Sequence, residues 1–166
     1  MLRFILPHHR IDSICELSLD RLRELELDAL LLDVDSTLKR YSQEDLLPEV
    51  KDWVEETRRG GISLCLLSNG MGGRIGRLAE RLQLPCVSQA CKPLPRGCHR
   101  ALKMIDAAAE RTAIVGDQLF ADIMAGRLAG LTTILVKPIH PEEEHWFTRI
   151  KRPVENVVLR CMNSPK

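Results

Sequence analysis

Short apolar runs alternate with longer amphipathic stretches along the chain. Continuous apolar runs cover residues 28–34, 62–67, 112–115 and 131–136, and a shorter one covers 86–88. An apolar run of this length without polar alternation is typical of a strand that is buried on both faces of a sheet. The amphipathic stretches predict helices over residues 18–25, 48–59, 74–83, 94–109 and 119–129, whereas residues 36–47 are polar and irregular and predict a loop.

Capping residues support two of these helices. Ser18 suits an N-cap, and Pro48 begins a helical stretch that Gly60 and Gly61 follow. Strands that alternate with helices predict right-handed crossovers, a mainly parallel sheet and helices on both of its faces. Since no repeat or long linker interrupts the pattern, we predict one three-layer α/β domain over residues 1–166. Its core covers about residues 28–136, and a C-terminal extension covers 137–166.

Composition and charge exclude several classes of protein. Lys and Arg number 24 and Asp and Glu number 23, so the net charge of +1 lacks the basic excess of a nucleic-acid-binding protein. The six cysteines show no repeated spacing and are predicted to be reduced thiols. No stretch approaches the roughly 20 apolar residues of a membrane-spanning helix. We therefore expect no transmembrane segment, no nucleic-acid partner, and a cytoplasmic protein that is at most peripheral on a membrane surface.

Polar side chains follow three of the predicted strands where each strand ends. They are Asp33, Asp35, Ser68, Asn69 and Asp117, and Lys92 lies in a loop before another helix. In open α/β sheets, ligands bind outside the carboxyl ends of the strands, where these groups meet. Three carboxylates at one edge repel one another unless positive charge lies among them, and oxygen ligands select a hard cation such as Mg²⁺. The set predicts a site for Mg²⁺ and for a dianion such as phosphate.

The same residues form four ordered motifs. The segment D-V-D-S-T-L (33–38) resembles motif I, D-x-D-x-T, of the haloacid dehalogenase (HAD) superfamily, and S-N (68–69) resembles motif II. K-P (92–93) resembles motif III, and G-D-Q-L-F-A-D (116–122) resembles motif IV in its G-D-x-x-x-x-D form. More narrowly, residues 116–136 and the following P-I-H-P-E-E-E-H-W-F-T-R-I-K-R resemble the YqeG-like branch of subfamily III. Relatives in that branch include a phosphatidylglycerophosphate phosphatase.

Two positions depart from that branch, because Ser36 stands where Asn is frequent and Gly70 replaces a frequent second Asn. Neither position carries charge, so the departures bear on the substrate rather than on the chemistry.

The resemblance implies a three-layer Rossmann-like HAD fold and a role for each polar residue. Asp33 would attack phosphorus to form an aspartyl-phosphate, and Asp35 would act as general acid and then as general base. Mg²⁺ would bind the carboxylates of Asp33 and Asp117 and the backbone carbonyl of Asp35. Ser68 and Lys92 would also take part in catalysis. The substrate would be bound by Thr37, Ser68, Asn69 and Lys92. Asp122 would not bind the metal directly but would hold a metal-bound water or Lys92.

The spacing of the motifs leaves no room for a cap domain. One loop and one helix use up the segment between Asp33 and Ser68, and one helix uses most of that between Ser68 and Lys92. We therefore predict a capless, open site that accepts a large substrate.

The segment 145–153, H-W-F-T-R-I-K-R-P, mixes Trp146 and Phe147 with Arg149, Lys151 and Arg152. It fits either contact with anionic lipid or packing of its aromatic side chains on the sheet.

Three functions remain open at this point. The first is a Mg²⁺-dependent phosphomonoester hydrolase that acts on phosphatidylglycerophosphate at a membrane surface. The second is a capless HAD phosphatase for a small soluble or protein-bound phosphate. The third is a catalytically idle HAD-like domain that binds a partner, against which the intact set of charged residues argues.

Overall fold

A six-stranded parallel sheet forms the centre of the protein. The computed structural model describes residues 4–140, 142 and 153. The strands lie in the order β1-β6-β5-β2-β3-β4, and each neighbouring pair is parallel. Their bounds are β1 (His9–Ile11), β2 (Ala29–Leu32), β3 (Ser63–Leu67), β4 (Cys86–Val87), β5 (Thr112–Gly116) and β6 (Thr132–Val136). This sheet confirms the predicted parallel α/β class.

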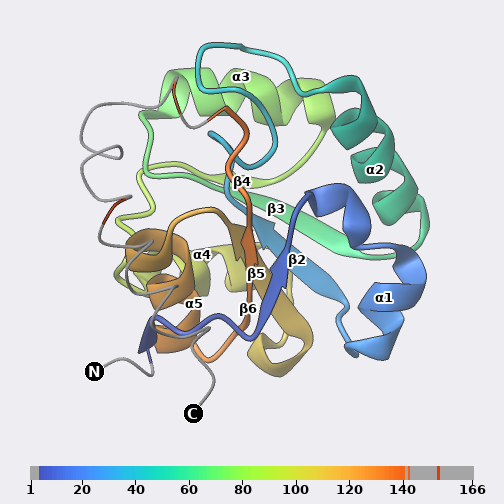
Figure 1. The fold of residues 1–166 in the computed structure, drawn as a ribbon, viewed down its shortest axis with the longest axis vertical. Helices are drawn as coiled ribbons and strands as arrows, with labels where there is room; N and C mark the ends of the chain where they lie inside the picture. Colours follow the sequence, from blue (N-terminus) through green and yellow to red (C-terminus); the bar gives the residue numbers. More distant parts are fainter. Residues whose placement is uncertain (1–3, 141, 143–152, 154–166) are drawn as a thin grey trace.

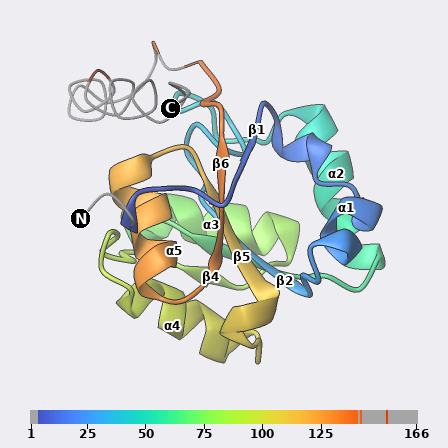
Figure 2. The same ribbon diagram turned by 60° about the horizontal axis from the view of Figure 1, so that its bottom comes forward.

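Helices cover both faces of the sheet, which gives three layers (Figure 1). The helices are α1 (Leu19–Glu24), α2 (Pro48–Arg59), α3 (Gly72–Leu82), α4 (Arg96–Met104) and α5 (Met124–Leu128). Side chains of α1, α2 and α3 share one apolar cluster with Leu30 and Leu32 of β2, whereas α4 and α5 pack in a second cluster with Leu31. Successive residues of β2 therefore point into opposite layers, as a strand buried on both faces requires. The turned view in Figure 2 shows the same separation of α4 and α5 from α1 and α2.

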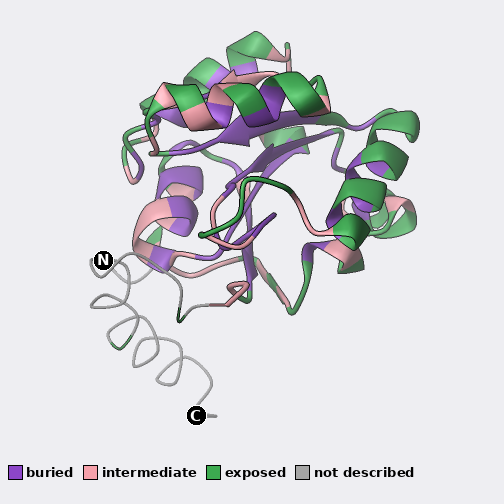
Figure 3. Ribbon diagram, turned by 90° about the horizontal axis from the view of Figure 1, so that it is seen from above, coloured by how far each residue is buried: buried purple, intermediate pink, exposed green. Residues whose placement is uncertain are grey.

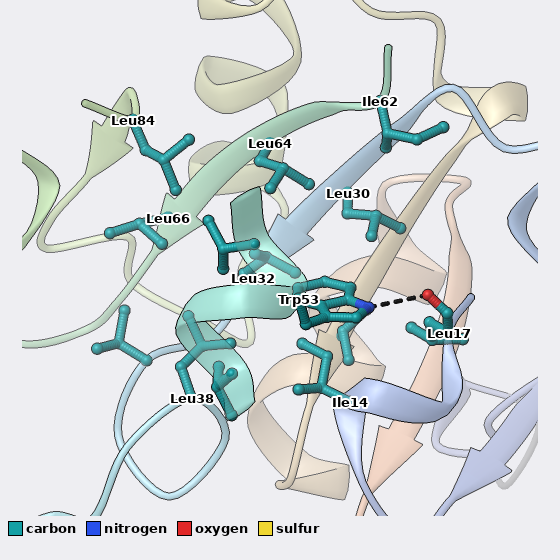
Figure 4. Packing of buried hydrophobic residues seen from close by; sticks show 14 of the residues in the cluster. Ile14, Leu17, Leu30, Leu32, Leu38, Trp53, Ile62, Leu64, Leu66 and Leu84 are labelled. Carbon is teal, nitrogen blue, oxygen red and sulfur yellow. Dashed lines mark hydrogen bonds between the residues drawn. The ribbon is translucent and has the colours of Figure 1, made fainter. Parts of the chain in front are cut away.

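The larger cluster includes Trp53 of α2 (Figure 4). Its indole N–H donates a 2.9 Å hydrogen bond to the carbonyl of Leu17, which joins α2 to the segment before α1. A buried indole needs such a partner for its polar atom. Figure 3 shows the strands as almost wholly buried and the helices as exposed on their outer sides. The residues that follow the strands are thus held by a sheet that is packed on both faces.

The predicted helix boundaries agree closely with the structure at α1 and α2. Ser18 caps α1, where its side chain accepts a hydrogen bond from the Arg21 N–H, and α2 begins at Pro48 and ends before Gly60. The helix predicted over 94–109 is shorter, because α4 ends at Met104 and Asp106 adopts a left-handed φ of 50°. Such a residue ends a helix.

Two further differences concern elements that the sequence pattern does not predict. The helix expected over 119–129 divides into a π-helical turn, η4 (Leu119–Ile123), and α5. The sequence pattern does not predict strand β1, because its three residues, H-R-I, form no apolar run. This strand pairs with β6 at the edge of the sheet. A three-residue 3-10 helix, η2 (Ile14–Glu16), follows it.

Two observations bear on the predicted access to the site. Between β2 and β3 the chain contains only a loop and α2, and between β3 and α4 only α3 and β4 with their connecting turns.

In the part of the chain that the structure describes, no helix is long and apolar enough to cross a membrane. The aromatic and basic side chains of the segment 145–153 lie outside the described residues; they are Trp146, Phe147, Arg149, Lys151 and Arg152.

Candidate active site

The candidate site lies where the order of the strands reverses direction. Strands β2 and β5 are neighbours in the sheet. From β2 the chain continues to β3 on one side, and from β5 it continues to β6 on the other side, so the two connections leave in opposite directions. Asp33 directly follows β2, and Asp117 directly follows β5. The Asp33 N–H donates a 2.9 Å hydrogen bond to the carbonyl of Val115, which holds the two strand ends together. Ligands of open α/β sheets bind at this kind of position.

Lys92 joins the ends of β2 and β3 to the helical turn that follows β5. Its ammonium group lies 2.5 Å from Asp33 Oδ1 and 2.6 Å from Asp122 Oδ1, and it donates a 2.9 Å hydrogen bond to the carbonyl of Leu67. All three donor positions of the ammonium are thereby engaged. The side chains of Lys92, Asp33 and Asp122 are almost completely buried, with exposed fractions of 3%, 9% and 1%. The structure thus brings Lys92 together with the predicted nucleophile and with the last Asp of the fourth motif.

Burial and neighbouring charge shift the pKa values of this pair. Burial raises the pKa of the Asp33 carboxyl well above its ordinary value; Lys92 opposes this rise, and Asp122 and Asp117 add to it. Burial alone would lower the pKa of Lys92, but Asp122 and Asp33 outweigh it and raise that pKa. Lys92 thus favours the ionised form of Asp33, and further positive charge beside this carboxylate would favour it more.

Three carboxylates are placed so that a cation could supply that charge. Asp33, Asp117 and Asp122 each offer an oxygen, and these oxygens lie within 4.8 Å of one another. The Thr37 hydroxyl donates a 3.1 Å hydrogen bond to Asp117 Oδ1 and so orients this carboxylate. With Lys92 counted, the buried group carries an excess of two negative charges when all three acids are ionised. A donor set of carboxylate oxygens with this excess fits a hard divalent cation.

Close packing fixes the position of Asp122. A Cβ added to Gly116 would lie only 2.3 Å from the carboxyl carbon of Asp122, so only glycine fits at the end of β5. Asp122 Oδ2 accepts a 3.0 Å hydrogen bond from the Gln118 N–H within the same turn. The π-helical turn η4 carries Asp122 into this place, and such wide turns are frequent at functional sites.

The residues after β3 support Lys92 through its backbone. The amide of Asn69 accepts a 2.8 Å hydrogen bond from the Lys92 N–H and donates a 2.9 Å hydrogen bond to the Lys92 carbonyl. Ser68 is buried, and its hydroxyl accepts a hydrogen bond of 3.0 Å from the Gly70 N–H. Asn69 thus positions the lysine, and the predicted contacts of Ser68 and Asn69 with substrate remain predictions.

Asp35 lies apart from the three clustered carboxylates, and its partners were missed in the sequence. Its Oδ1 atom lies 2.7 Å from Lys39 Nζ and 2.5 Å from Arg74 Nη2. The first turns of α1 and α2 contain Asp20 and Glu49, whereas α3 has no acidic residue there and carries Arg74 instead. This pattern could not have singled out Arg74, because α4 also lacks an acidic first turn and begins with Arg96.

Comparison with known proteins identifies the family of the chain. A family model of hydrolases, described as haloacid dehalogenase-like hydrolase, matches residues 5–130. The chain belongs to this family and is a HAD-type phosphatase. It is 29% identical over 160 residues to a Bacillus subtilis (strain 168) protein named "Probable phosphatase YqeG", with 96% of this chain and 92% of that protein covered.

Two more distant relatives carry more specific names. A phosphoserine phosphatase of Thermus thermophilus is 34% identical over 108 residues, which cover 59% of this chain and 43% of that protein. The chloroplastic/mitochondrial phosphatidylglycerophosphate phosphatase 1 of Arabidopsis thaliana is 21% identical over 167 residues, which cover 95% of this chain and 48% of that protein. The chain thus spans about half the length of these two relatives.

Solved structures show the same fold at low sequence identity. The cobalt-bound deoxy-D-mannose-octulosonate 8-phosphate phosphatase of Haemophilus influenzae superposes with a TM-score of 0.53 at 19% identity, over 68% of this chain and 70% of that one. NagD from Escherichia coli K-12 superposes with a TM-score of 0.56 at 16% identity, over 75% of this chain and 91% of that one. At these identities the likeness establishes the fold alone.

Proposed function

We propose that the protein hydrolyses a phosphomonoester through a phosphorylated Asp33, and that its substrate is phosphatidylglycerophosphate. The observation that carries the chemistry is the buried contact of 2.5 Å between Lys92 and Asp33, with Asp117 and Asp122 beside it. A carboxylate held against a fixed ammonium, at the open edge of a sheet, suits attack on a phosphoryl group, because that reaction depends on positioning and charge stabilisation.

In the proposed reaction, a carboxylate oxygen of Asp33 attacks phosphorus, and the bond between phosphorus and the ester oxygen breaks. The leaving oxygen takes a proton from Asp35, which releases the alcohol. A water molecule then attacks phosphorus in the aspartyl-phosphate while Asp35 accepts its proton, so that phosphate leaves and Asp33 is restored. Throughout, the Lys92 ammonium balances charge on Asp33 and on the phosphoryl oxygens.

We further propose that Mg²⁺ binds at the carboxylates of Asp33 and Asp117 and at the backbone carbonyl of Asp35. When bound, it would supply positive charge beside the phosphoryl oxygens and beside ionised Asp33. Thr37 keeps Asp117 oriented for this purpose, and Asp122 holds Lys92 in place. The predicted contribution of the Thr37 backbone to phosphate binding stays a prediction.

Two observations support the lipid substrate: the length of the alignment with a lipid phosphatase, and the access to the site. Nearly the whole chain, 95%, aligns with the Arabidopsis thaliana phosphatidylglycerophosphate phosphatase. In addition, no domain is inserted between β2 and β3 or between β3 and α4, where a cap would cover the site. A phosphate at the surface of a bilayer can reach such an edge without leaving its leaflet. The basic side chains of Arg149, Lys151 and Arg152 would together contribute about 3 kcal/mol to docking on anionic lipid.

Phosphate release from matched substrates tests this proposal. The purified protein with Mg²⁺ is given phosphatidylglycerophosphate in anionic vesicles, glycerol 3-phosphate or phosphoserine, and Asp33→Asn is the inactive control. We expect the vesicle substrate to be hydrolysed fastest, with a rate that falls as salt concentration rises. Equal or faster hydrolysis of the soluble substrates, without salt dependence, would favour a small-molecule phosphatase. No hydrolysis of any substrate would favour a partner-binding domain.

A further inference from the structure

Two cations share one oxygen of Asp35, and they differ in their access to solvent. Lys39 Nζ and Arg74 Nη2 both contact Asp35 Oδ1. The side chain of Lys39 is 1% exposed, and its ammonium also donates to the carbonyls of Arg40 and Gln43. All three of its donor positions are therefore used inside the protein. Lys39 alone already provides Asp35 with a buried counter-charge.

Among the residues that the structure describes, Arg74 keeps donors free for a ligand. Its side chain is 37% exposed, and its hydrogen bonds go to Asp35 Oδ1 and to the carbonyl of Tyr41, at 3.3 Å. A guanidinium has five N–H donors in one plane, so two bonds leave three donors. The Tyr41 ring lies against the guanidinium, 5.5 Å from its centroid, and limits its rotation. Arg74 is therefore a fixed, partly exposed cation beside the predicted general acid.

The start of α3 reinforces this positive charge. The helix is 11 residues long, and no acidic side chain occupies its first turn. Its N-terminal end carries the positive pole of the helix dipole, where a cation such as Arg74 is unfavourable without an anion nearby. Asp35 supplies one negative charge against Lys39, Arg74 and this helix end. Among the groups that contact Asp35, positive charge therefore exceeds negative charge, which suits a second anion at Arg74.

The proposed chemistry places the substrate's alcohol at this point. If Asp35 protonates the leaving oxygen, as the proposed function requires, the groups next to Asp35 lie next to the leaving alcohol. We propose that Arg74 binds a second anionic group carried by that alcohol and thereby selects substrates with two anionic groups. In phosphatidylglycerophosphate this group is the phosphodiester, which a three-carbon glycerol separates from the phosphate that leaves. A guanidinium binds phosphate oxygens with two parallel hydrogen bonds, which suits this role.

Substrates with and without the second anion test the role of Arg74. Deacylated headgroup, which is glycerophosphoglycerol phosphate, carries a phosphodiester, whereas glycerol 3-phosphate carries none. Phosphoserine serves as a third substrate, with a carboxylate in place of the phosphodiester. In Arg74→Met we expect KM for the headgroup to rise by about 10- to 100-fold, as for the loss of charge-assisted hydrogen bonds, with little change for glycerol 3-phosphate. A similar rise for phosphoserine would widen the specificity to any second anion.

Two variants separate binding from positioning. Lys39→Met removes the buried ammonium that contacts Asp35, and the buried side chain cannot reach the substrate. This variant should therefore lower kcat for both substrates and leave the ratio of their KM values unchanged. Arg77→Met removes an exposed arginine one turn further along α3 that pairs with Glu44 at 3.7 Å, and it should change neither parameter. An equal effect of Arg74→Met on both substrates would overturn the inference and leave Arg74 as a positioning residue for Asp35.

A binding measurement keeps this inference distinct from the lipid substrate. In the Asp33→Asn background, which cannot turn substrate over, calorimetry compares the affinity for the headgroup with and without Arg74→Met. Loss of affinity supports a second-anion site even if vesicles prove to be poor substrates. Unchanged affinity overturns it even if the protein hydrolyses phosphatidylglycerophosphate.

Discussion

Thr37 and Asp117 lie 80 positions apart in the sequence, and the Thr37 hydroxyl donates a 3.1 Å hydrogen bond to Asp117 Oδ1. Both residues are buried, with exposed fractions of 1% and 3%. Groups that orient a metal-binding carboxylate are worth about 10- to 100-fold in metal affinity or activity. We therefore expect Thr37→Val, which keeps the shape and removes the hydroxyl, to raise the Mg²⁺ concentration for half-maximal activity about tenfold. Thr37→Ser is the matched control and should stay close to wild type; an unchanged Mg²⁺ requirement in Thr37→Val would contradict the orienting role.

Asp33→Asn tests the nucleophile. An amide of the same size cannot form the aspartyl-phosphate, so phosphate release should fall below about 0.1% of wild type. Circular dichroism checks that the fold is intact, since Lys92 keeps Asp122 and the Leu67 carbonyl as partners. Substantial turnover by a folded Asp33→Asn protein would move the nucleophile elsewhere.

The sequence predicted the gathering of Asp33, Lys92 and Asp117 because topology alone requires it. Each residue follows or neighbours the carboxyl end of a parallel strand, and such ends share one edge of the sheet. The apolar runs before Asp33 and Asp117 predict their strands, and the alternation with helices supports the shorter run before Lys92. Strand β1 could not be predicted, since its pairing with β6 depends on a contact between residues that are distant in sequence.

The neighbours of Asp35 could not be predicted for a different reason. Lys39 reaches Asp35 only through the turn of the intervening loop, where Ser36 adopts a left-handed φ of 63°. Arg74 comes from a helix 39 positions away. Motif matching identifies residues by type and order, whereas these contacts depend on where two long side chains end. The position of Ser36 is frequently Asn in the resembled branch, and Asn tolerates this backbone conformation better than most residues.

Mg²⁺ should also stabilise the folded protein without any substrate. A ligand at 100 times its Kd contributes about 2.7 kcal/mol, which for a chain of this size raises Tm by about 5–10 °C. Asp117→Asn removes one charge from the carboxylate cluster and should abolish most of this shift in a thermal unfolding experiment. Asp45→Asn, which changes an exposed acid paired with Arg81, should leave the shift intact. If Mg²⁺ does not change the Tm of the wild type, the proposed metal site is excluded.

The stability of the metal-free protein should depend on pH through Asp33. Burial raises the pKa of this carboxyl in the folded state, whereas an Asp in an unfolded chain titrates near about 3.9. A raised folded-state pKa means that the folded protein binds the proton more tightly than the unfolded chain, so ionised Asp33 lowers the free energy of unfolding at high pH. This decrease in the free energy of unfolding is complete above the pKa of Asp33 in the folded state. It disappears as the pH falls toward the pKa of Asp33 in the unfolded chain. In EDTA at pH 7.5, Asp33→Asn should therefore unfold at a higher urea concentration than wild type, and the difference should shrink by pH 5. A lower urea midpoint for Asp33→Asn than for wild type at pH 7.5 would show instead that Asp33 is stabilised as an anion, with Lys92 outweighing its burial.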